Sequence, residues 1–312
     1  MKNKLSNIKK ALNYLNNNDC IAIPTETVYG LAGNAYSNSA TDKIFKLKKR
    51  PKKNPLIVHY YNLKLLKKDC FLSRKFLKLY KKFCPGPISF VLKLKDKSLI
   101  SKNVTNNNKT LAVRFPKHPL TRKLLSKLKY PLAAPSANIA TRISPVKKEH
   151  VVDEFGKKIK FILDGGQSKI GLESTIISLI NKPQILRLGG LEKKKLNNFL
   201  KINTKYVKKP KKILVPGQGK LHYSPKIPIR LNIKNPRQYE AFVLINKRKL
   251  SDKNFFYLTK NRNLKEAAKN LYSILRKIKK KKFKSIAIEK IPNKGIGETI
   301  NDRLIRASKF KW

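Results

Sequence analysis

Polar side chains that could bind a ligand crowd together directly after the first apolar run of the chain. Thr25, Glu26, Thr27 and Tyr29 follow residues 21–23, which have the apolar character of a buried strand. Polar groups gathered where a strand stops are typical of binding sites in α/β proteins, because loops there carry function on a rigid scaffold. We therefore expect a ligand to bind at this end of the strand.

Two cations stand at the end of the helix predicted over residues 41–49, just before Pro51. Lys48 and Arg50 lie two residues apart and could surround a triphosphate, the guanidinium by bidentate bonds and the ammonium as a point charge. A solvated basic patch is the alternative, because the chain holds 74 Lys and Arg residues. The two prolines at 51 and 55 restrict the backbone after the cations, which favours a ligand site.

A histidine and an arginine lie in two further apolar strands. His59 is near the end of the strand predicted over residues 56–60, where it could meet Thr27 in one crevice and bond a substrate hydroxyl or amine. A surface histidine is the alternative. Arg114 lies in an apolar strand and needs an anionic partner if it is buried, either a ligand or a carboxylate such as Glu26.

Composition limits the classes to which this 312-residue chain can belong. Its three widely spaced cysteines fit neither a zinc cluster nor a disulfide framework, and they suit a reducing cytosol. No apolar run is long enough to cross a bilayer, so we expect a cytoplasmic protein. The formal net charge of +57 reflects either the codon bias of an AT-rich genome or a surface selected for polyanions. In both cases it would hold tRNA or double-stranded RNA weakly.

Apolar periodicity predicts an α/β (α+β) fold. The predicted helices cover residues 5–15, 41–49, 74–83, 119–128, 147–155, 191–200, 264–278 and 298–308. The predicted strands cover residues 21–23, 56–60, 88–94, 111–115, 132–134, 161–163, 174–179, 184–188, 227–233, 241–245, 255–258 and 285–291. Residues 29–38 are expected to form a loop. Because several strands follow one another directly, we expect a twisted mixed sheet with helices on both faces.

The chain divides into two predicted domains and a linker. Residues 1–203 form the first domain, residues 204–226 the linker and residues 227–312 a small Rossmann-like α/β domain. This second domain lacks the glycine fingerprint and acidic residue of a dinucleotide site. The linker is either a flexible tether or, because Tyr223 is flanked by Pro and Gly, a lid over an active site.

Several motifs, in this order, resemble the YrdC-like family of threonylcarbamoyl-AMP synthases in its long two-domain form. They are residues 24–31 (PTETVYGL), 48–50 (KKR), 54–56 (NPL), 111–116 (LAVRFP), 133–138 (AAPSAN), 171–175 (GLEST), 185–189 (ILRLG) and 222–225 (HYSP). The family usually has proline where Leu188 stands, so the local backbone there is expected to differ.

The resemblance implies roles for individual residues. The residues implied for ATP are Lys48, Arg50, Asn54, Thr110, Ser136, Asn138, Ser144, Arg187 and Tyr223, the first two being catalytic. Those implied for L-threonine are Thr27, His59, Arg114, Ala134 and Ser174. Mg²⁺ is expected to arrive with ATP, held by the phosphates without protein ligands. We expect Thr27, His59, Arg50 and Ser136 to share one pocket.

The resemblance also implies an activity. The chain would be a nucleotidyltransferase that converts L-threonine, bicarbonate (or CO2) and ATP to threonylcarbamoyl-AMP and pyrophosphate. This is the first step of N6-threonylcarbamoyladenosine formation at position 37 of ANN-decoding tRNAs, and a separate tRNA threonylcarbamoyl transferase would take the product. Two alternatives stay open: a nucleic-acid-binding protein that grips double-stranded RNA by its backbone, and the same chemistry on another amino acid.

Overall fold

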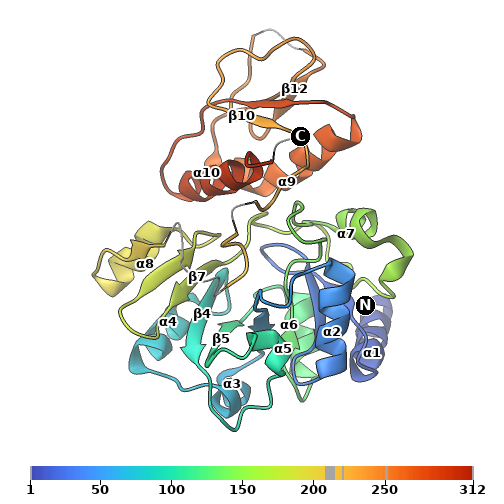
Figure 1. Cartoon of the computed structure of the whole chain (residues 1–312), viewed down its shortest axis with the longest axis vertical. Coiled ribbons are helices and arrows are strands. Elements are labelled where there is room, and N and C mark those ends of the chain that lie inside the picture. The colour runs from blue at the N-terminus through green and yellow to red at the C-terminus, as the bar shows by residue number, and fades with distance from the viewer. Residues whose placement is uncertain (1, 208–214, 220, 250–251, 311–312) are drawn as a thin grey trace.

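The structure is a computed structural model that describes residues 2–207, 215–219, 221–249 and 252–310 of the chain, with the side chains of residues 2–5 excepted. It contains a large unit built on a nine-stranded sheet and a small unit built on a four-stranded sheet. Figure 1 shows the small unit above the large one, with its two helices on the side that faces the large unit. Within the described residues, no helix has both the length and the apolar character that crossing a bilayer requires.

The large unit is a mixed sheet with helices around it, as the strand pattern predicts. Its strands are β1 (Ile21–Ile23), β2 (Gly30–Asn34), β3 (Ile57–His59), β4 (Ile88–Lys93), β5 (Thr110–Arg114), β6 (Leu132–Ala133), β7 (Thr175–Ser178), β8 (Gln184–Arg187) and β9 (Lys205–Tyr206). Their spatial order is β1-β2-β6-β3-β5-β4-β7-β8-β9. Strand β3 pairs parallel with β5, whereas β4 pairs antiparallel with β5.

Helices cover this sheet. They are α1 (Lys2–Asn16), α2 (Asn38–Lys48), α3 (Leu63–Asp69), α4 (Arg74–Phe83), α5 (Lys102–Thr105), α6 (Pro119–Ser126), α7 (Lys148–Phe155) and α8 (Lys193–Leu200). Helices α2, α3, α4 and α5 begin at residues whose side chains cap the helix. The Ser37 side chain accepts from the backbone N–H of Ala40 at the start of α2, satisfying one of the free donors there. Ile44 and Lys48 lie four residues apart on the buried face of α2, so the helix that packs Ile44 also carries Lys48 inward.

The expectation of a loop over residues 29–38 is wrong, because residues 30–34 form β2 and α2 begins at Asn38. Glycine and asparagine disfavour strands, but β2 is held on both sides by β1 and β6. A Cβ on Gly33 would lie 3.3 Å from Cδ1 of Ile44, so glycine lets α2 pack closely on the strand.

Three other differences from the predicted elements are local. The strand expected over residues 161–163 makes only a single bridge, between Ala22 and Ile162. The short helices α3 and α5 were not expected, since they are too short and too lysine- and asparagine-rich to show a helical period. Strand β9 lies in the segment predicted as linker and pairs with β8. The domain boundaries themselves stay a prediction, and residues 208–214 of the predicted linker lie outside the described residues.

The small unit is a parallel sheet with two helices. Its strands are β10 (Ile229–Leu231), β11 (Ala241–Leu244), β12 (Phe255–Tyr257) and β13 (Ile286–Ile288), in the spatial order β10-β13-β11-β12. Its helices are α9 (Leu264–Lys280) and α10 (Ile296–Ala307). The apolar face of α9 is buried, as its spacing predicts.

Candidate active site

The cavity that gathers most of the predicted site residues lies at the end of two parallel strands. His59 ends β3 and Arg114 ends β5, and the two residues are partners in the strand register. Linker residues Pro216, His222 and Tyr223 line the same cavity from another side. The free space inside is about 40 Å³, room for no more than one or two water molecules. The linker therefore helps to enclose a small, polar cavity.

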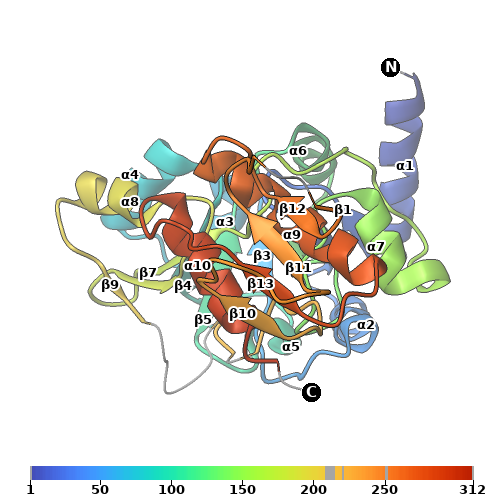
Figure 2. The same cartoon turned by 90° about the horizontal axis from the view of Figure 1, so that it is seen from above.

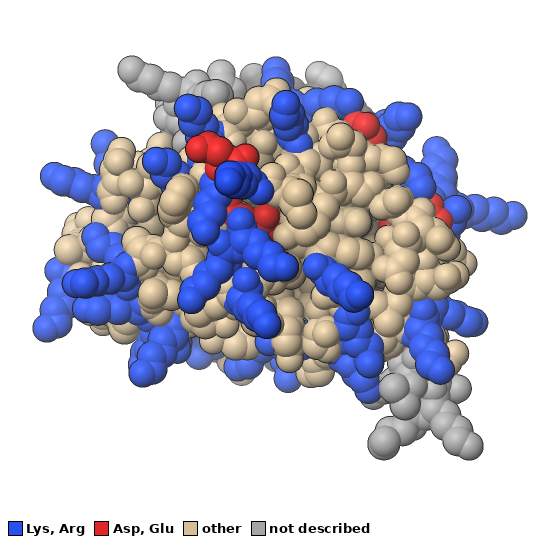
Figure 3. Space-filling model, turned by 90° about the horizontal axis from the view of Figure 1, so that it is seen from below, with Lys and Arg blue, Asp and Glu red and all other residues tan. Residues whose placement is uncertain are grey.

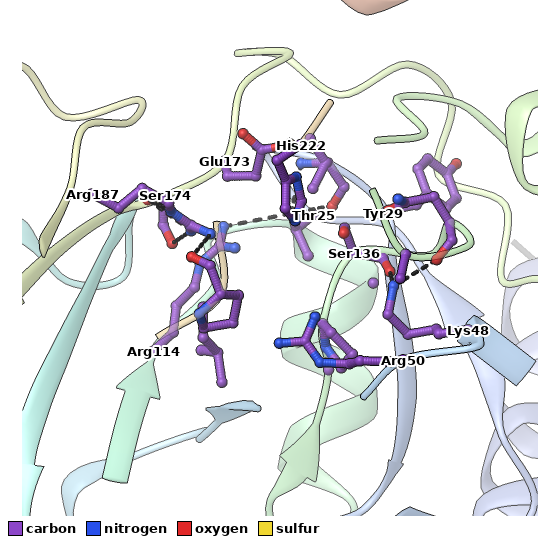
Figure 4. A pocket seen from close by; sticks show the side chains of 18 of the residues that line it. Thr25, Tyr29, Lys48, Arg50, Arg114, Ser136, Glu173, Ser174, Arg187 and His222 are labelled. Carbon is purple, nitrogen blue, oxygen red and sulfur yellow. Dashed lines mark hydrogen bonds between the residues drawn. The ribbon is translucent and has the colours of Figure 1, made fainter. Parts of the chain in front are cut away.

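Lys48 reaches this cavity from the last turn of α2. Its ammonium donates to the carbonyl oxygens of Ser136 (2.5 Å) and Asn138 (2.6 Å), as Figure 4 shows for the pocket from close by. Burial, and then the charge of Arg50, holds the pKa of Lys48 well below its usual value. No carboxylate of the described residues lies within 4.0 Å of this ammonium. Lys48 thus carries a cation that an incoming anion could stabilise.

Two arginines add to this positive charge. Arg50 donates to the carbonyl oxygens of Asn54 (3.1 Å) and Pro55 (3.0 Å). Desolvation, together with the charge of Arg187, lowers the pKa of Arg50 to about 10. Arg187, at the end of β8, donates to the carbonyl and hydroxyl oxygens of Ser174 at 2.9 to 3.1 Å. Both guanidinium groups bond only neutral oxygens, so their charge is uncompensated at hydrogen-bond range among the described residues.

Arg114 differs from these two arginines because it forms an ion pair with a carboxylate. This carboxylate belongs to Glu26, one of the partners that the sequence suggested. The Nη2 of Arg114 lies 2.7 Å from Oε1 of Glu26, whose other oxygen accepts from the backbone N–H of Lys117. The Nε of Arg114 has no hydrogen-bond partner among the described residues, and neither has Nδ1 of His59. Burial, then the charge of Arg114, holds the pKa of His59 well below its usual value, so the imidazole is neutral. One edge of Arg114 is fixed and another is available to a ligand.

Hydroxyl and amide groups complete the wall. The hydroxyls of Ser174 and Ser89 lie 2.8 Å apart, and Ser174 lines the cavity. Asn138 donates through its Nδ2 to the carbonyl oxygens of Ile139 and Arg142, which orients its Oδ1, an atom without a partner among the described residues. Figure 4 shows Lys48, Arg50 and Ser136 on one side of the pocket and Arg187, Ser174 and Arg114 on the other.

Most of the predicted site residues therefore meet. The cavity is lined by Lys48, Arg50, His59, Arg114, Ala134, Ser136, Asn138, Ser174, Arg187 and Tyr223. Four predicted residues do not line it. The hydroxyl of Thr27 lies 2.8 Å from that of Thr25, which lines the cavity. Asn54 contributes only its carbonyl oxygen, which accepts from Arg50. The expected sharing of one pocket thus holds for His59, Arg50 and Ser136, with Thr27 behind the wall.

The other two predicted ATP ligands are placed differently. Ser144 is fully buried, and its hydroxyl donates to Oε1 of Glu173 at 2.6 Å, so it braces a residue of the wall. Thr110 begins β5, four residues from Arg114 on the same face of the strand, because side chains alternate along a strand. Direct contacts of Ser144 and Thr110 with a nucleotide stay predictions.

The sequence implies no individual role for Glu173 and His222, and it predicts Thr25 and Tyr29 only as members of a polar cluster at the end of the first strand. Thr25, Tyr29, Glu173 and His222 line the cavity, and burial lowers the pKa of His222 to about 3. The Tyr29 hydroxyl donates to the carbonyl oxygen of Gly166 at 2.9 Å. A signal for Glu173 was available: it is one of only 17 acidic residues and directly precedes Ser174.

Glu173 connects the cavity with the small unit. Its carboxylate lies 2.8 Å from Nε of Arg303 on α10 and accepts from the hydroxyl of Tyr272 on α9 at 3.0 Å. Although burial opposes ionisation, the charges of Arg303 and Arg187 hold the pKa of Glu173 below its usual value. The guanidinium of Arg303 also lies 4.5 Å from the ring centroid of Tyr223, a cation–π contact. The second unit thus buttresses one wall of the cavity.

Gly217 lets the linker pass through this crowded region. Its φ of +88° favours glycine, and a Cβ there would lie 2.4 Å from the hydroxyl of Tyr223 and 2.9 Å from Cδ of Arg187. Any larger residue would displace Tyr223 or Arg187. The close approach of the linker therefore depends on this glycine.

Comparison with known proteins agrees with this arrangement over nearly the whole chain. Residues 13–189 match the family of Sua5, YciO and YrdC proteins described as telomere recombination. Residues 182–309 match the family described as threonylcarbamoyl-AMP synthase, C-terminal domain. This chain belongs to the threonylcarbamoyl-AMP synthase family. The long form that the sequence resembles is confirmed, because both family regions are present.

Relatives within the threonylcarbamoyl-AMP synthase family cover both units. The chain is 33% identical to the threonylcarbamoyl-AMP synthase of Bacillus subtilis, over 96% of this chain and 92% of that protein. It is 34% identical to the Pyrococcus abyssi protein of the same name, over 97% and 94%. The crystal structure of P. abyssi Sua5 complexed with L-threonine superposes with a TM-score of 0.89 at 31% identity, covering 97% and 94% of the two chains.

Proposed function

We propose that this chain joins L-threonine, bicarbonate (or CO2) and ATP into threonylcarbamoyl-AMP and releases pyrophosphate. One observation carries the proposal: a single cavity places three cations without carboxylate partners beside an arginine and a serine suited to an amino acid. Membership of the threonylcarbamoyl-AMP synthase family supports it. It is therefore a nucleotidyltransferase.

The amino acid would bind at the Arg114 side of the cavity. The unpartnered Nε of Arg114 can donate to the threonine carboxylate while Glu26 holds the other side of the guanidinium. The neutral imidazole of His59 and the hydroxyl of Ser174 can bond the threonine amine and hydroxyl. The related P. abyssi protein was crystallised with L-threonine, which agrees with an amino-acid site in this fold.

The triphosphate would bind at the cations Lys48, Arg50 and Arg187. The threonine amine captures CO2, and an oxygen of the resulting carbamate attacks the α-phosphate in line, so that pyrophosphate leaves. The protein needs no covalent intermediate, because positioning and charge stabilisation suffice for this displacement. Among the described residues, no group of three or more His, Cys, Asp and Glu side chains is arranged to hold a metal ion. Mg²⁺ would arrive with ATP, bound by its phosphates.

The linker would close the site over the product. Tyr223 is buried, lines the cavity and stacks on Arg303, so it is held from the side of the small unit. A closed site protects a labile mixed anhydride from water. Because the free space inside the cavity is much smaller than ATP, we expect the linker to move outward when ATP binds.

The proposed function includes a later step on tRNA, which another enzyme would carry out. We propose that the product goes to a separate tRNA threonylcarbamoyl transferase, which modifies adenosine 37 of ANN-decoding tRNAs, in the cytoplasm. Figure 3 shows Lys and Arg side chains spread over the face remote from the small unit, with few acidic ones. Such a surface would hold RNA weakly and without sequence preference.

Pyrophosphate exchange tests the activity. We expect labelled pyrophosphate to enter ATP only when both L-threonine and bicarbonate are present. Threonine and serine are then compared at equal concentration, and a higher rate with serine would assign a different amino acid. RNA binding that disappears at moderate salt, without any exchange, would favour the nucleic-acid-binding alternative and contradict the proposal.

A further inference from the structure

A second cavity lies behind the active site, between α2 and α7. The two helices lie side by side in both views of the chain (Figures 1 and 2). The cavity has a volume of about 520 Å³, which is in the range that small organic ligands occupy in proteins. None of the residues assigned above to ATP or threonine lines it.

The floor of this second cavity is apolar. It is formed by Cys20, Leu47, Ile139 and Phe155. Cys20 and Phe155 are almost fully buried, whereas Leu47 and Ile139 are half-buried. An apolar floor gives a ligand body a surface to cover, and its burial would contribute to binding.

Five lysines and two carboxylates form the rim. One carboxylate is Asp19, which is engaged by Lys43 at 2.7 Å and Lys160 at 3.0 Å. Asp19 offsets one of these two positive charges, so the cluster of Asp19, Lys43 and Lys160 keeps a single excess positive charge. The pairing fixes one side of the rim.

The other carboxylate, Glu154, is paired with two arginines. It lies 3.0 Å from Nη2 of Arg276 and 3.6 Å from Nη1 of Arg142, and it accepts from the backbone N–H of Ile139. Its charge is therefore used by two guanidinium groups. It is not available to balance the rim.

Three lysines of the rim have no carboxylate partner among the described residues. Lys46, Lys49 and Lys158 are exposed, and no carboxylate of the described residues lies within 4.0 Å of their ammonium groups. They converge from α2 and from the turn after α7 on the same 520 Å³ space. Ammonium groups that surround an apolar floor complement a phosphate carried on an apolar body.

The two cavities share their wall. Asn138 and Ala140 line the active site, whereas Ile139, the residue between them, lines the second cavity. Lys48 lines the active site, whereas its neighbour Lys49 lines the second cavity. A ligand in the second cavity would therefore lie back to back with the nucleotide, separated by one thickness of backbone.

We infer that the space between α2 and α7 is a second ligand site, which takes a small organic phosphate with an aromatic or aliphatic body. The body packs on Leu47, Ile139 and Phe155, and the phosphate is held by the rim lysines. A duplex backbone has no apolar body to cover this floor, and the cavity matches the size of a small molecule. The site is independent of the reaction proposed above.

Affinity labelling tests the site directly. The full-length protein, saturated with L-threonine and a non-hydrolysable ATP analogue, is treated with one equivalent of pyridoxal 5′-phosphate, an aromatic phosphate whose aldehyde condenses with lysine. Borohydride then reduces the imine, and peptide mapping locates the label. We expect Lys46, Lys49 or Lys158 to be labelled about tenfold more than the exposed Lys75 and Lys157. Phenyl phosphate should suppress this label, and inorganic phosphate at equal concentration should not.

Even labelling of all exposed lysines would overturn the inference. Equal suppression by inorganic phosphate would also overturn it, because the apolar floor would then contribute nothing. Since this measurement uses the unaltered protein, it does not depend on whether a variant folds. It also does not depend on catalysis, so its failure would leave the proposed function untouched.

A charge-matched pair of double variants gives a second test. Lys46→Glu with Lys158→Glu should weaken pyridoxal phosphate binding at least about tenfold. The control, Lys64→Glu with Lys75→Glu, makes the same change in net charge at exposed residues of α3 and α4, which do not line the cavity, and should bind as the unaltered protein does. Threonine-dependent pyrophosphate exchange reports that each variant is folded. Equal binding by the two variants would refute the site.

Discussion

The buried cations of this protein lie in two regions, which differ in whether a carboxylate lies beside each cation. Where the small unit meets the large one, guanidinium groups face carboxylates, with Arg303 2.8 Å from Glu173 and Arg276 3.0 Å from Glu154. In the active site, Lys48 and its neighbouring arginines donate to neutral oxygens. The first region is internally balanced, and the second is balanced only when an anion binds.

The scarcity of acids makes this difference informative. The chain has 17 acidic residues against 74 basic ones, so most cations cannot have a partner. A buried cation beside one of these acids serves the structure, because an unpaired buried charge is costly. A buried cation without one is kept for a ligand. Arg114 stands between the two groups, since Glu26 satisfies one of its edges and leaves Nε free.

The strongest test of the unbalanced region is Arg50→Ala. We expect pyrophosphate exchange to fall by about 100- to 1000-fold, the loss typical when one preorganised donor to a developing charge is removed. Lys49→Ala, an exposed neighbour, is the control and should exchange at the normal rate. A loss of only a few-fold in the Arg50 variant would show that this guanidinium does not face the phosphates.

Substitutions in the internally balanced region should lower the stability of the protein. Arg303→Met should lower the free energy of unfolding by about 3–5 kcal/mol, because it leaves the carboxylate of Glu173 buried and unpaired. Lys280→Met breaks the exposed pair with Asp153 and should cost less than about 1 kcal/mol. Urea unfolding of the two variants measures both values. Equal losses would mean that burial does not distinguish the two pairs.

Arg114 should show a selective effect on the amino acid. Arg114→Ala should raise the KM for L-threonine by about 10- to 100-fold, the worth of one charged hydrogen bond, and change the KM for ATP far less. Steady-state exchange with each substrate varied in turn measures this ratio. If both KM values rose equally, the carboxylate would bind elsewhere. Glu26→Gln, which keeps the shape of the ion pair, should have a smaller effect in the same direction.

The smallest expected effect is the uptake of a proton when ATP binds. Burial lowers the pKa of Lys48 in the empty cavity, and bound phosphates would raise it again. The complex then binds more protons than the empty protein, so ATP affinity should fall as the pH rises through the pKa of Lys48 in the complex. Calorimetry above about pH 8, where a phosphate with a pKa near 6 is fully ionised, should show proton uptake that varies with buffer. Proton release would contradict a pKa of Lys48 that rises when phosphates bind.

Most of the fold could be predicted because its elements are short, apolar and well punctuated. Helix α4 and strand β1 have the predicted bounds, since capping, proline and apolar runs mark their ends. Strand β2 could not be predicted, because its glycines contradict local propensity and only its neighbours stabilise it. Tertiary contacts decide such segments.

The site could be predicted through its cations and hydroxyls but not through its supports. Lys48 and Ser174 stand in motifs that resemble a known family, and both line the cavity. The role of Glu173 depends on its contact with Arg303, which lies 130 residues later in the chain. No local sequence pattern predicts this contact. His222 stands in a motif without an implied role, because only the folded linker brings it to this wall.

The most direct test of the account is a crystal structure with L-threonine and a non-hydrolysable ATP analogue. We predict phosphate oxygens within hydrogen-bond distance of Lys48, Arg50 and Arg187, and the threonine carboxylate on Nε of Arg114. An analogue bound away from these cations, which would leave their charges unbalanced beside the amino acid, would contradict the account.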